Sequence, residues 1–161
     1  MNTYGITDSP FGKLILAKTE DGLCLLKYVD QSAELKAAHP GPGYSQDDAW
    51  ATAIVNKWMA GKSLGINLSP LGTSFQMDVW NALLKVPLGT TVSYGELARK
   101  AGHPKAVRAV GSAVSRNPIC IIIPCHRVLP KDGKLGNYRS GSHRKKLLLE
   151  WEGASFRPNP A

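Results

Sequence analysis

Residues 93–118, SYGELARKAGHPKAVRAVGSAVSRNP, carry the pattern that decides the fold of the second half of the chain. Ser93 and Glu96 stand three residues apart, as in a capping box, and predict the start of a short helix. The helix is expected to run through Leu97 and Ala98 and to end at Gly102, because glycine favours a helix end.

A second short helix is predicted directly after this turn. Pro104 suits its first turn, and the Asn117-Pro118 pair ends it. Its apolar face consists of residues at helical spacing, namely Val107, Val110, Gly111 and Val114. Two short helices joined by a glycine turn predict a helix-turn-helix whose second helix has the recognition role.

The segments before the helix pair predict a mixed fold. Three short apolar runs separated by turn sequences predict antiparallel strands, at residues 4–7, 13–18 and 23–29. A loop is expected at residues 38–46, then a helix that presents Trp50, Ile54 and Trp58 and stops at Gly61. Another helix is expected from Thr73, which forms a capping box with Gln76. The predicted class is α/β (α+β): a small N-terminal antiparallel sheet with a helix, then a mostly helical, winged-helix-like domain.

The distribution of charge divides the chain near residue 70, just before the helix predicted from Thr73. The 161 residues carry a net charge of +8. Residues 1–70 hold six Lys/Arg and seven Asp/Glu, a balance of −1, whereas residues 71–161 hold fourteen and five, a balance of +9. We therefore expect an N-terminal α/β domain at 1–70 and a second domain at 71–161 whose basic surface attracts a polyanion, most commonly nucleic acid. Solubility is the alternative explanation of the charge.

Several classes of protein are disfavoured. No apolar run reaches the ~18 residues that span a bilayer, and MNTYGITDSP lacks the pattern of a secretory signal. A cytoplasmic protein, nucleoid-associated if prokaryotic, is therefore expected, with its three cysteines reduced and no membrane partner. No metal-ligand spacing and no phosphate-binding glycine motif is present, so neither metal nor cofactor is expected.

The chemistry gathers at Pro124-Cys125-His126-Arg127-Val128, which follows the apolar run 119–123. A thiol is a good nucleophile only as the thiolate, and His126 and Arg127 can take its proton or favour the anion. Contact between adjacent side chains requires an irregular backbone, because neighbours on a strand face opposite sides. Two other readings stay open here: a cysteine hydrolase, and a non-catalytic helix-turn-helix or lesion-recognition module that binds DNA.

These residues resemble the O6-alkylguanine-DNA alkyltransferase family (methylated-DNA–protein-cysteine methyltransferases). The resemblance covers about residues 73–153 and rests on six motifs: PCHRV at 124–128, RAVG at 108–111, NP at 117–118, GNY at 136–138, LL at 147–148 and EG at 152–153. It implies a single-turnover, direct-reversal repair protein that flips an alkylated guanine out of double-stranded DNA. The protein then moves the alkyl group irreversibly from O6 to its own cysteine, with O4-alkylthymine as a second candidate lesion. It also implies a monomer without cofactor.

The resemblance further implies roles for single residues. Cys125 is the acceptor, His126 withdraws the thiol proton through a water molecule, and Glu152 orients the imidazole. Asn117 braces the turn that carries the cysteine, and Tyr138 hydrogen-bonds or protonates the departing guanine.

The DNA contacts implied by the resemblance lie mostly on the predicted recognition helix. Arg108 enters the vacated base stack and Tyr94 presses on the adjacent phosphate. The other expected DNA-binding residues are Lys105, Ala106, Gly111, Ser112 and Ser115. Residues expected to line the substrate pocket are Val128, Leu135, Gly136, Arg139 and Ser140.

One position departs from the family pattern. Many members carry a small residue followed by Gly-Gly after the Asn-Tyr pair, whereas this chain has Arg139-Ser140-Gly141. Alkyl-group preference and access to the pocket are expected to depend on Arg139, which can also reach a phosphate. The last seven residues, SFRPNPA, are predicted to form a loosely ordered tail.

Overall fold

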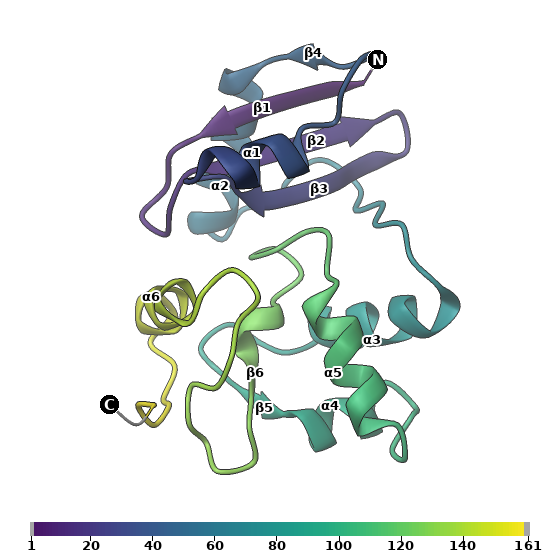
Figure 1. The fold of residues 1–161 in the computed structure, drawn as a ribbon, viewed down its shortest axis with the longest axis vertical. Helices are drawn as coiled ribbons and strands as arrows, with labels where there is room; N and C mark the ends of the chain where they lie inside the picture. The colour runs from purple at the N-terminus through teal and green to yellow at the C-terminus, as the bar shows by residue number, and fades with distance from the viewer. Residues whose placement is uncertain (1, 160–161) are drawn as a thin grey trace. The chain divides into compact units, whose positions relative to one another are not determined.

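The structure is a computed structural model that describes residues 2–159. It divides into two compact units: residues up to Leu71 together with Pro118–Cys120, and Gly72–Asn117 together with the residues from Ile121 onward. Figure 1 shows the course of the chain through both. Each unit is described separately below.

The first unit is built on a four-stranded sheet. Its strands are β1 (Thr3–Thr7), β2 (Leu14–Thr19), β3 (Gly22–Tyr28) and β4 (Ser45–Gln46), in the order β3-β2-β1-β4. The first three pair antiparallel, which confirms the predicted sheet, and the short β4 pairs parallel to β1. The outer edge of β3 is extended by residues from far along the sequence, because Leu26 exchanges backbone hydrogen bonds with Pro118 and Cys120 at 2.9 Å each.

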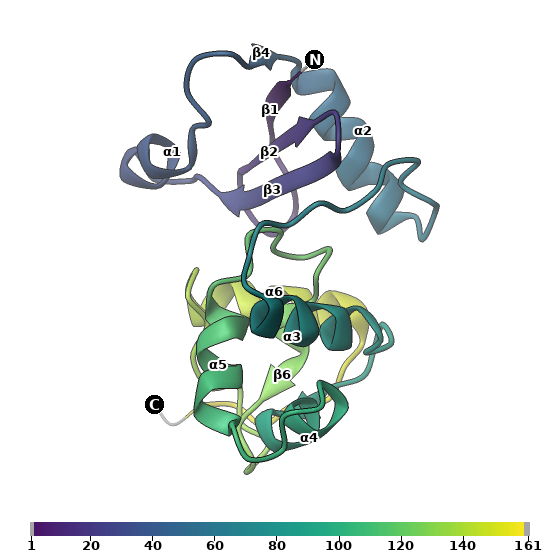
Figure 2. The same cartoon turned by 90° about the vertical axis from the view of Figure 1, so that its right-hand side faces the viewer.

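Helix α2 (Asp48–Met59) lies along one face of this sheet (Figure 2). Asp47 caps its N-terminus by accepting from Trp50 N. The start of the helix approaches β1 closely, since a Cβ at Gly5 would lie 2.3 Å from the Asp47 carbonyl oxygen. The predicted helix is confirmed, but its buried face is centred on Ala51, Ile54 and Val55, with both tryptophans only half-buried.

Two elements of the first unit were not predicted from the sequence. Helix α1 (Ser32–Ala38) buries no residue, so it has no apolar stripe for periodicity to detect. Strand β4 falls inside the segment expected to be a loop at 38–46, and two residues are too few to show an alternating pattern.

The second unit contains the helix-turn-helix. It comprises α3 (Ser74–Leu84), β5 (Val92–Ser93), α4 (Tyr94–Lys100), α5 (Val107–Ser115), the 3₁₀ turn η1 (Cys125–Arg127), β6 (Val128–Leu129) and α6 (Ser142–Glu152). Both predicted capping boxes are present, at Thr73 with Gln76 and at Ser93 with Glu96. The predicted fold class is thereby confirmed.

The start of the recognition helix is a correction. Pro104 was expected in its first turn, but α5 begins at Val107 and Pro104 belongs to the turn before it. Ala106 occupies the N-cap without a side-chain hydrogen bond, so the usual polar capping signal is missing and the boundary could not be read. Trp80 links α3 to α5, because its Nε1 donates a buried hydrogen bond to the Ala113 carbonyl oxygen at 2.9 Å.

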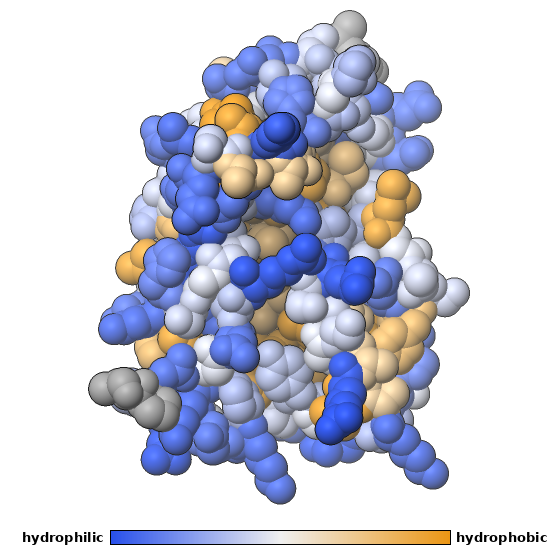
Figure 3. Space-filling model, viewed as in Figure 1, coloured by the Kyte–Doolittle hydropathy of each residue, from blue (hydrophilic) through white to orange (hydrophobic). Residues whose placement is uncertain are grey.

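The expected loose tail is also a correction for the part that is described. Arg157 and Asn159 form hydrogen bonds with residues 132–136, and residues 160–161 lie outside the described part. The face shown in Figure 3 is mostly hydrophilic, with small separate apolar areas. Among residues 2–159 no helix is long and apolar enough to cross a bilayer.

Candidate active site

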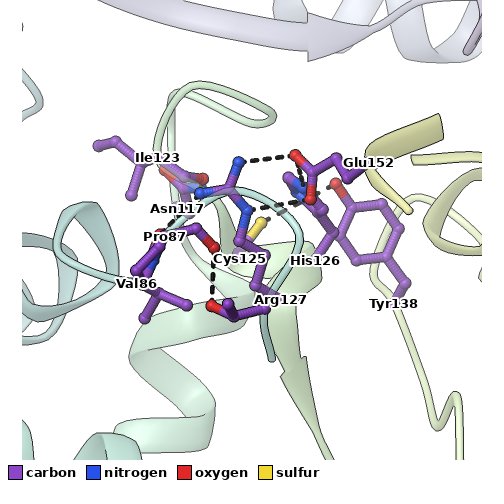
Figure 4. A network of polar contacts seen from close by, with 10 residues as sticks. Val86, Pro87, Asn117, Ile123, Cys125, His126, Arg127, Tyr138 and Glu152 are labelled. Carbon is purple, nitrogen blue, oxygen red and sulfur yellow. Dashed lines mark hydrogen bonds and ion pairs between the residues drawn. The ribbon is translucent and has the colours of Figure 1, made fainter. Parts of the chain in front are cut away.

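Cys125 lies at the start of the 3₁₀ turn that follows the buried run Ile119–Ile123 (Figure 4). The turn is closed by hydrogen bonds from Cys125 N to the Ile123 carbonyl oxygen, 2.8 Å, and from Arg127 N to the Pro124 carbonyl oxygen, 3.0 Å. The side chain of Cys125 is almost fully buried, at 7% exposure. The irregular backbone that the adjacent cysteine and histidine require is therefore present.

The backbone ahead of the cysteine is held under strain. Ile121 has φ of 73°, a conformation that costs a β-branched residue about 1–3 kcal/mol. Asn117 is buried, and its Nδ2 donates to the Ile123 carbonyl oxygen at 2.7 Å. This bond ties the end of the recognition helix to the segment two residues before Cys125.

Glu152 is the centre of a buried ionic cluster. Its Oε2 lies 3.1 Å from His126 Nε2, and both of its oxygens accept from Arg127, at 3.0 Å from Nε and 2.6 Å from Nη2. Burial raises the pKa of Glu152, but the hydrogen bonds and charges of His126 and Arg127 outweigh it and lower the pKa to about 2. The carboxylate is therefore ionised at neutral pH.

His126 is fully buried and its pKa is lowered. Burial is the largest cause; the Glu152 carboxylate opposes it, while the positive charges of Arg127 and Lys145 add to it. The imidazole is therefore neutral at pH 7 and can accept a proton. Within residues 2–159 its Nδ1 has no hydrogen-bond partner, which leaves that nitrogen available as the acceptor.

Arg127 was expected only to favour the thiolate or take its proton, and Lys145 was missed as a site residue. Arg127 is buried, with Nη1 donating to the Val86 carbonyl oxygen at 2.7 Å. Its place within PCHRV was the only available signal. Lys145 is 1% exposed and donates to the carbonyl oxygens of Val128 (2.7 Å) and Asn137 (3.3 Å). Burial lowers the pKa of Lys145 to about 8, against the opposing influence of Cys125. A lysine next to Lys146 on a helix gives no sequence signal of burial.

Tyr138 completes the surroundings of the thiol. The Sγ of Cys125 lies 3.9 Å from the Tyr138 hydroxyl, within hydrogen-bond range for sulfur (Figure 4). A groove of about 640 Å³ opens beside Tyr138, lined by Tyr94, Gly111, Ser112, Ser115, Arg116, Asn137, Tyr138 and Arg139. Burial, and secondarily the charge of Cys125, raise the pKa of Tyr94, so its hydroxyl stays protonated and can donate. Arg139 reaches across to α5, where Nη1 donates to the Ser115 carbonyl oxygen at 3.1 Å.

The predicted DNA-contact residues lie partly on one exposed surface of α5. Arg108, Ser112 and Ser115 follow one another at helical spacing, and all three are exposed. Lys105 and Ala106 lie in the turn before the helix rather than on it.

The predicted pocket residues are less closely gathered. Of the five, only Arg139 lines the groove. Val128 is fully buried in β6, and Leu135 packs in an apolar cluster with Leu129 and Leu149. Gly136 approaches Pro130 so closely that a Cβ would lie 2.6 Å from its ring, and the Ser140 carbonyl oxygen accepts from Arg144. Among the described residues there is no group of three or more His, Cys, Asp or Glu that could hold a metal ion.

Comparison with known proteins gives consistent matches along the chain. Residues 74–154 match the family described as 6-O-methylguanine DNA methyltransferase, DNA binding domain, and residues 2–56 match its ribonuclease-like domain. A methylated-DNA–protein-cysteine methyltransferase of Methanosarcina acetivorans is 44% identical over 94% of this chain and 98% of its own length. One of the same name from Mycobacterium bovis is 44% identical over 92% of this chain and 91% of its own.

Solved structures agree with these relatives. The crystal structure of Mycobacterium tuberculosis OGT in complex with DNA matches with a TM-score of 0.79 and 40% identity, over 94% of this chain and 92% of that one. The M. tuberculosis O6-methylguanine methyltransferase structure matches with a TM-score of 0.79 and 42% identity, over 95% and 93%. The buried Cys125 beside the His126–Glu152–Arg127 cluster thus lies in a chain that belongs to the 6-O-methylguanine DNA methyltransferase family.

Proposed function

We propose that this protein repairs DNA by direct reversal, transferring the alkyl group from O6-alkylguanine to the Sγ of Cys125 once per molecule. The observation that carries the assignment to Cys125 is its position, with Sγ 3.9 Å from the Tyr138 hydroxyl and next in the chain to a neutral, buried His126. Relatives named for this activity cover nearly the whole chain. The enzyme is consumed by its reaction.

The proposed chemistry is a single displacement at the alkyl carbon. The thiol proton passes to Nδ1 of His126, through a water molecule, and Glu152 stabilises the imidazolium that forms. The thiolate attacks the alkyl carbon, a C–S bond forms, and the C–O6 bond breaks. Guanine leaves with the electron pair of that bond and takes up one proton, while Tyr138 donates a hydrogen bond to it. The His126 imidazolium gives up the proton that it took from the thiol, so no net proton is consumed. The products are guanine in DNA and an S-alkylcysteine.

Double-stranded DNA is the proposed partner, held by the second unit. One relative of known structure is bound to DNA, and the exposed α5 surface carries Arg108 among small residues that let a helix approach a groove. Extruding a base costs a few kcal/mol, which Arg108 offsets by filling the vacated stack. Tyr94 would press on the neighbouring phosphate from the groove beside Cys125. In this assignment residues 71–161 form the DNA-binding and alkyl-acceptor domain.

The assignment is tested by following loss of O6-methylguanine from a duplex oligonucleotide. Wild-type protein in molar excess is expected to convert the lesion to guanine, and Cys125→Ser to convert none. Cys120→Ser is the matched control, since Cys120 is also buried and lies five residues earlier; it is expected to retain transfer. Equal loss of lesion with Cys125→Ser would overturn the proposal.

The non-catalytic DNA-binding module is not favoured, because the full-length relatives are named as methyltransferases. A cysteine hydrolase would turn over repeatedly and release its product. A protein that stops after one equivalent excludes it.

A further inference from the structure

The loop that carries Tyr138 has little structure of its own. It connects β6 to α6 over residues 130–141 and contains no helix and no strand of the sheets. A loop of this length would ordinarily be mobile. Alkyl transfer as proposed needs the Tyr138 hydroxyl at a defined distance from Cys125, so something must hold the loop.

The segment Phe156–Asn159 supplies the backbone contacts. Leu135 N donates to the Arg157 carbonyl oxygen at 2.9 Å, and Arg157 N donates to the Gly133 carbonyl oxygen at 2.8 Å. These two bonds form an isolated parallel bridge between Lys134 and Arg157. The end of the chain therefore adds a short strand-like partner to the loop.

Of the contacts that residues 156–159 make with the loop, those of Asn159 lie nearest to Tyr138 along the chain. Its Oδ1 accepts from Gly136 N at 2.9 Å, and its Nδ2 donates to the Gly136 carbonyl oxygen at 3.3 Å. The carboxamide thus pairs with both backbone groups of one residue, as a neighbouring strand would. Gly136 stands two residues before Tyr138, and its φ of +69° with the close Pro130 ring leaves no space for another residue type.

An apolar contact of Phe156 anchors residues 156–159 to the core of the unit. Phe156 packs against the buried cluster of Leu129, Leu135 and Leu149, which joins β6, the loop and α6. The anchor and the paired carboxamide lie three residues apart. Together they connect the core of the unit to the backbone beside Tyr138.

We propose that residues 156–159 are a strap that fixes the loop bearing Tyr138, and that Asn159 is a positioning residue for alkyl transfer. This inference rests on the proposed function, because only that reaction requires Tyr138 near the thiol. Asn159 acts through Gly136 and touches neither thiol nor substrate. Removing its carboxamide releases the loop without changing the nucleophile.

The test compares Asn159→Ala with Ser155→Ala, an exposed change in the same tail. Asn159→Ala is expected to slow methyl transfer from duplex DNA by about threefold to tenfold, the equivalent of one or two exposed hydrogen bonds. Its rate of Cys125 alkylation by iodoacetamide, which needs no tyrosine, is expected to stay within about twofold of wild type. Asn159→Asp keeps the acceptor for Gly136 N, and its methyl-transfer rate is expected to lie between those of Asn159→Ala and the wild type. Ser155→Ala is expected to match wild type in both assays.

Two further measurements separate positioning from general damage. In a Tyr138→Phe background, Asn159→Ala is expected to cause no additional loss of transfer rate, because the group it positions is gone. Amide hydrogen exchange at residues 133–138 is expected to be faster in Asn159→Ala than in wild type, whatever the activity. Unchanged exchange, or additive losses with Tyr138→Phe, overturns the strap. Absence of methyl transfer by the wild-type protein would instead overturn the proposed function and leave the exchange result to decide the strap.

Discussion

The two units of this protein differ in what they bury. Among the described residues the first unit buries no charged side chain, and its buried side-chain oxygens are the hydroxyls of Thr7 and Tyr28. The second unit buries five ionisable side chains within residues 126–152: His126, Arg127, Arg144, Lys145 and Glu152. Buried charges cost free energy unless they are paired, and replacing them with apolar residues often stabilises a protein. The second core therefore keeps charged groups that the proposed reaction needs, whereas the first core is stabilised by apolar packing.

Glu152→Gln is expected to have the largest effect on the stability of the second unit. The substitution keeps the shape of the side chain but leaves the buried Arg127 guanidinium without an anion. We expect the free energy of unfolding, measured with urea, to fall by about 3 kcal/mol. Glu150→Gln, an exposed change on the same helix, is expected to stay within about 0.5 kcal/mol of wild type. Equal stability of the two variants would mean that the buried ionic cluster is not what holds the second unit together.

The same carboxylate makes stability depend on pH. The pKa of Glu152 lies at about 2 in the folded protein, below its ordinary 4.5. Its contribution is therefore complete above pH 4.5 and is lost as the pH falls toward 2. The pKa of His126 is also lowered, so acidification below its ordinary 6.5 destabilises the folded protein in the same direction. Unfolding free energies measured from pH 7 to 2 should show the gap between wild type and Glu152→Gln closing below pH 4.5. A gap that stays constant through this range would contradict the assigned pKa.

Lys145→Met tests the buried cation with a smaller expected effect. The change keeps an apolar side chain of similar length but leaves the carbonyl oxygens of Val128 and Asn137 without their donor. We expect a loss of about 1–2 kcal/mol, because relief of the buried charge offsets part of the lost bonding. Lys146→Met, its exposed neighbour, is the control and should change stability by less than about 0.5 kcal/mol. A more stable Lys145→Met protein would show that both carbonyls find other donors.

Arg108→Ala compares an exposed cation of the second unit with one of the first, and its effect on stability should be the smallest of the four. Lys36→Ala removes the same charge from the exposed α1 helix of the first unit. Both variants are expected to unfold within about 0.5 kcal/mol of wild type. Arg108→Ala alone should slow repair of duplex DNA, and more than it slows reaction with free O6-alkylguanine base. Equal losses with both substrates would remove Arg108 from base flipping, and equal losses in both variants would mean that overall charge accounts for the effect.

Much of the fold could be predicted because its signals are local. Capping boxes at Thr73 and Ser93 and the apolar runs of β1–β3 depend on residues within one turn or strand. The boundary of α5 was wrong because Ala106 supplies no side-chain cap. Helix α1 was not predicted, because it buries no residue and so shows no apolar periodicity.

The site was only partly predictable for the same reason. The PCHRV motif pointed to the thiol and its neighbour through resemblance. The resemblance also pointed to Glu152, but not to its pairing with Arg127. It gave no sign of the buried Lys145 on α6 or of the Val86 carbonyl oxygen that accepts from Arg127. Nothing in a lysine or in SFRPNPA reveals burial or pairing, because those depend on tertiary contacts that local patterns do not encode. The residues of the Phe156–Asn159 strap therefore read as a free tail.

The most direct test of the account is peptide mapping after incubation with excess O6-methylguanine duplex. The account predicts one methyl group per chain, on the peptide that contains Cys125, with no increase at longer times. Cys24 and Cys120 should remain unmodified. Methylation at either of those two cysteines, continued turnover beyond one equivalent, or an unmodified Cys125 would contradict it.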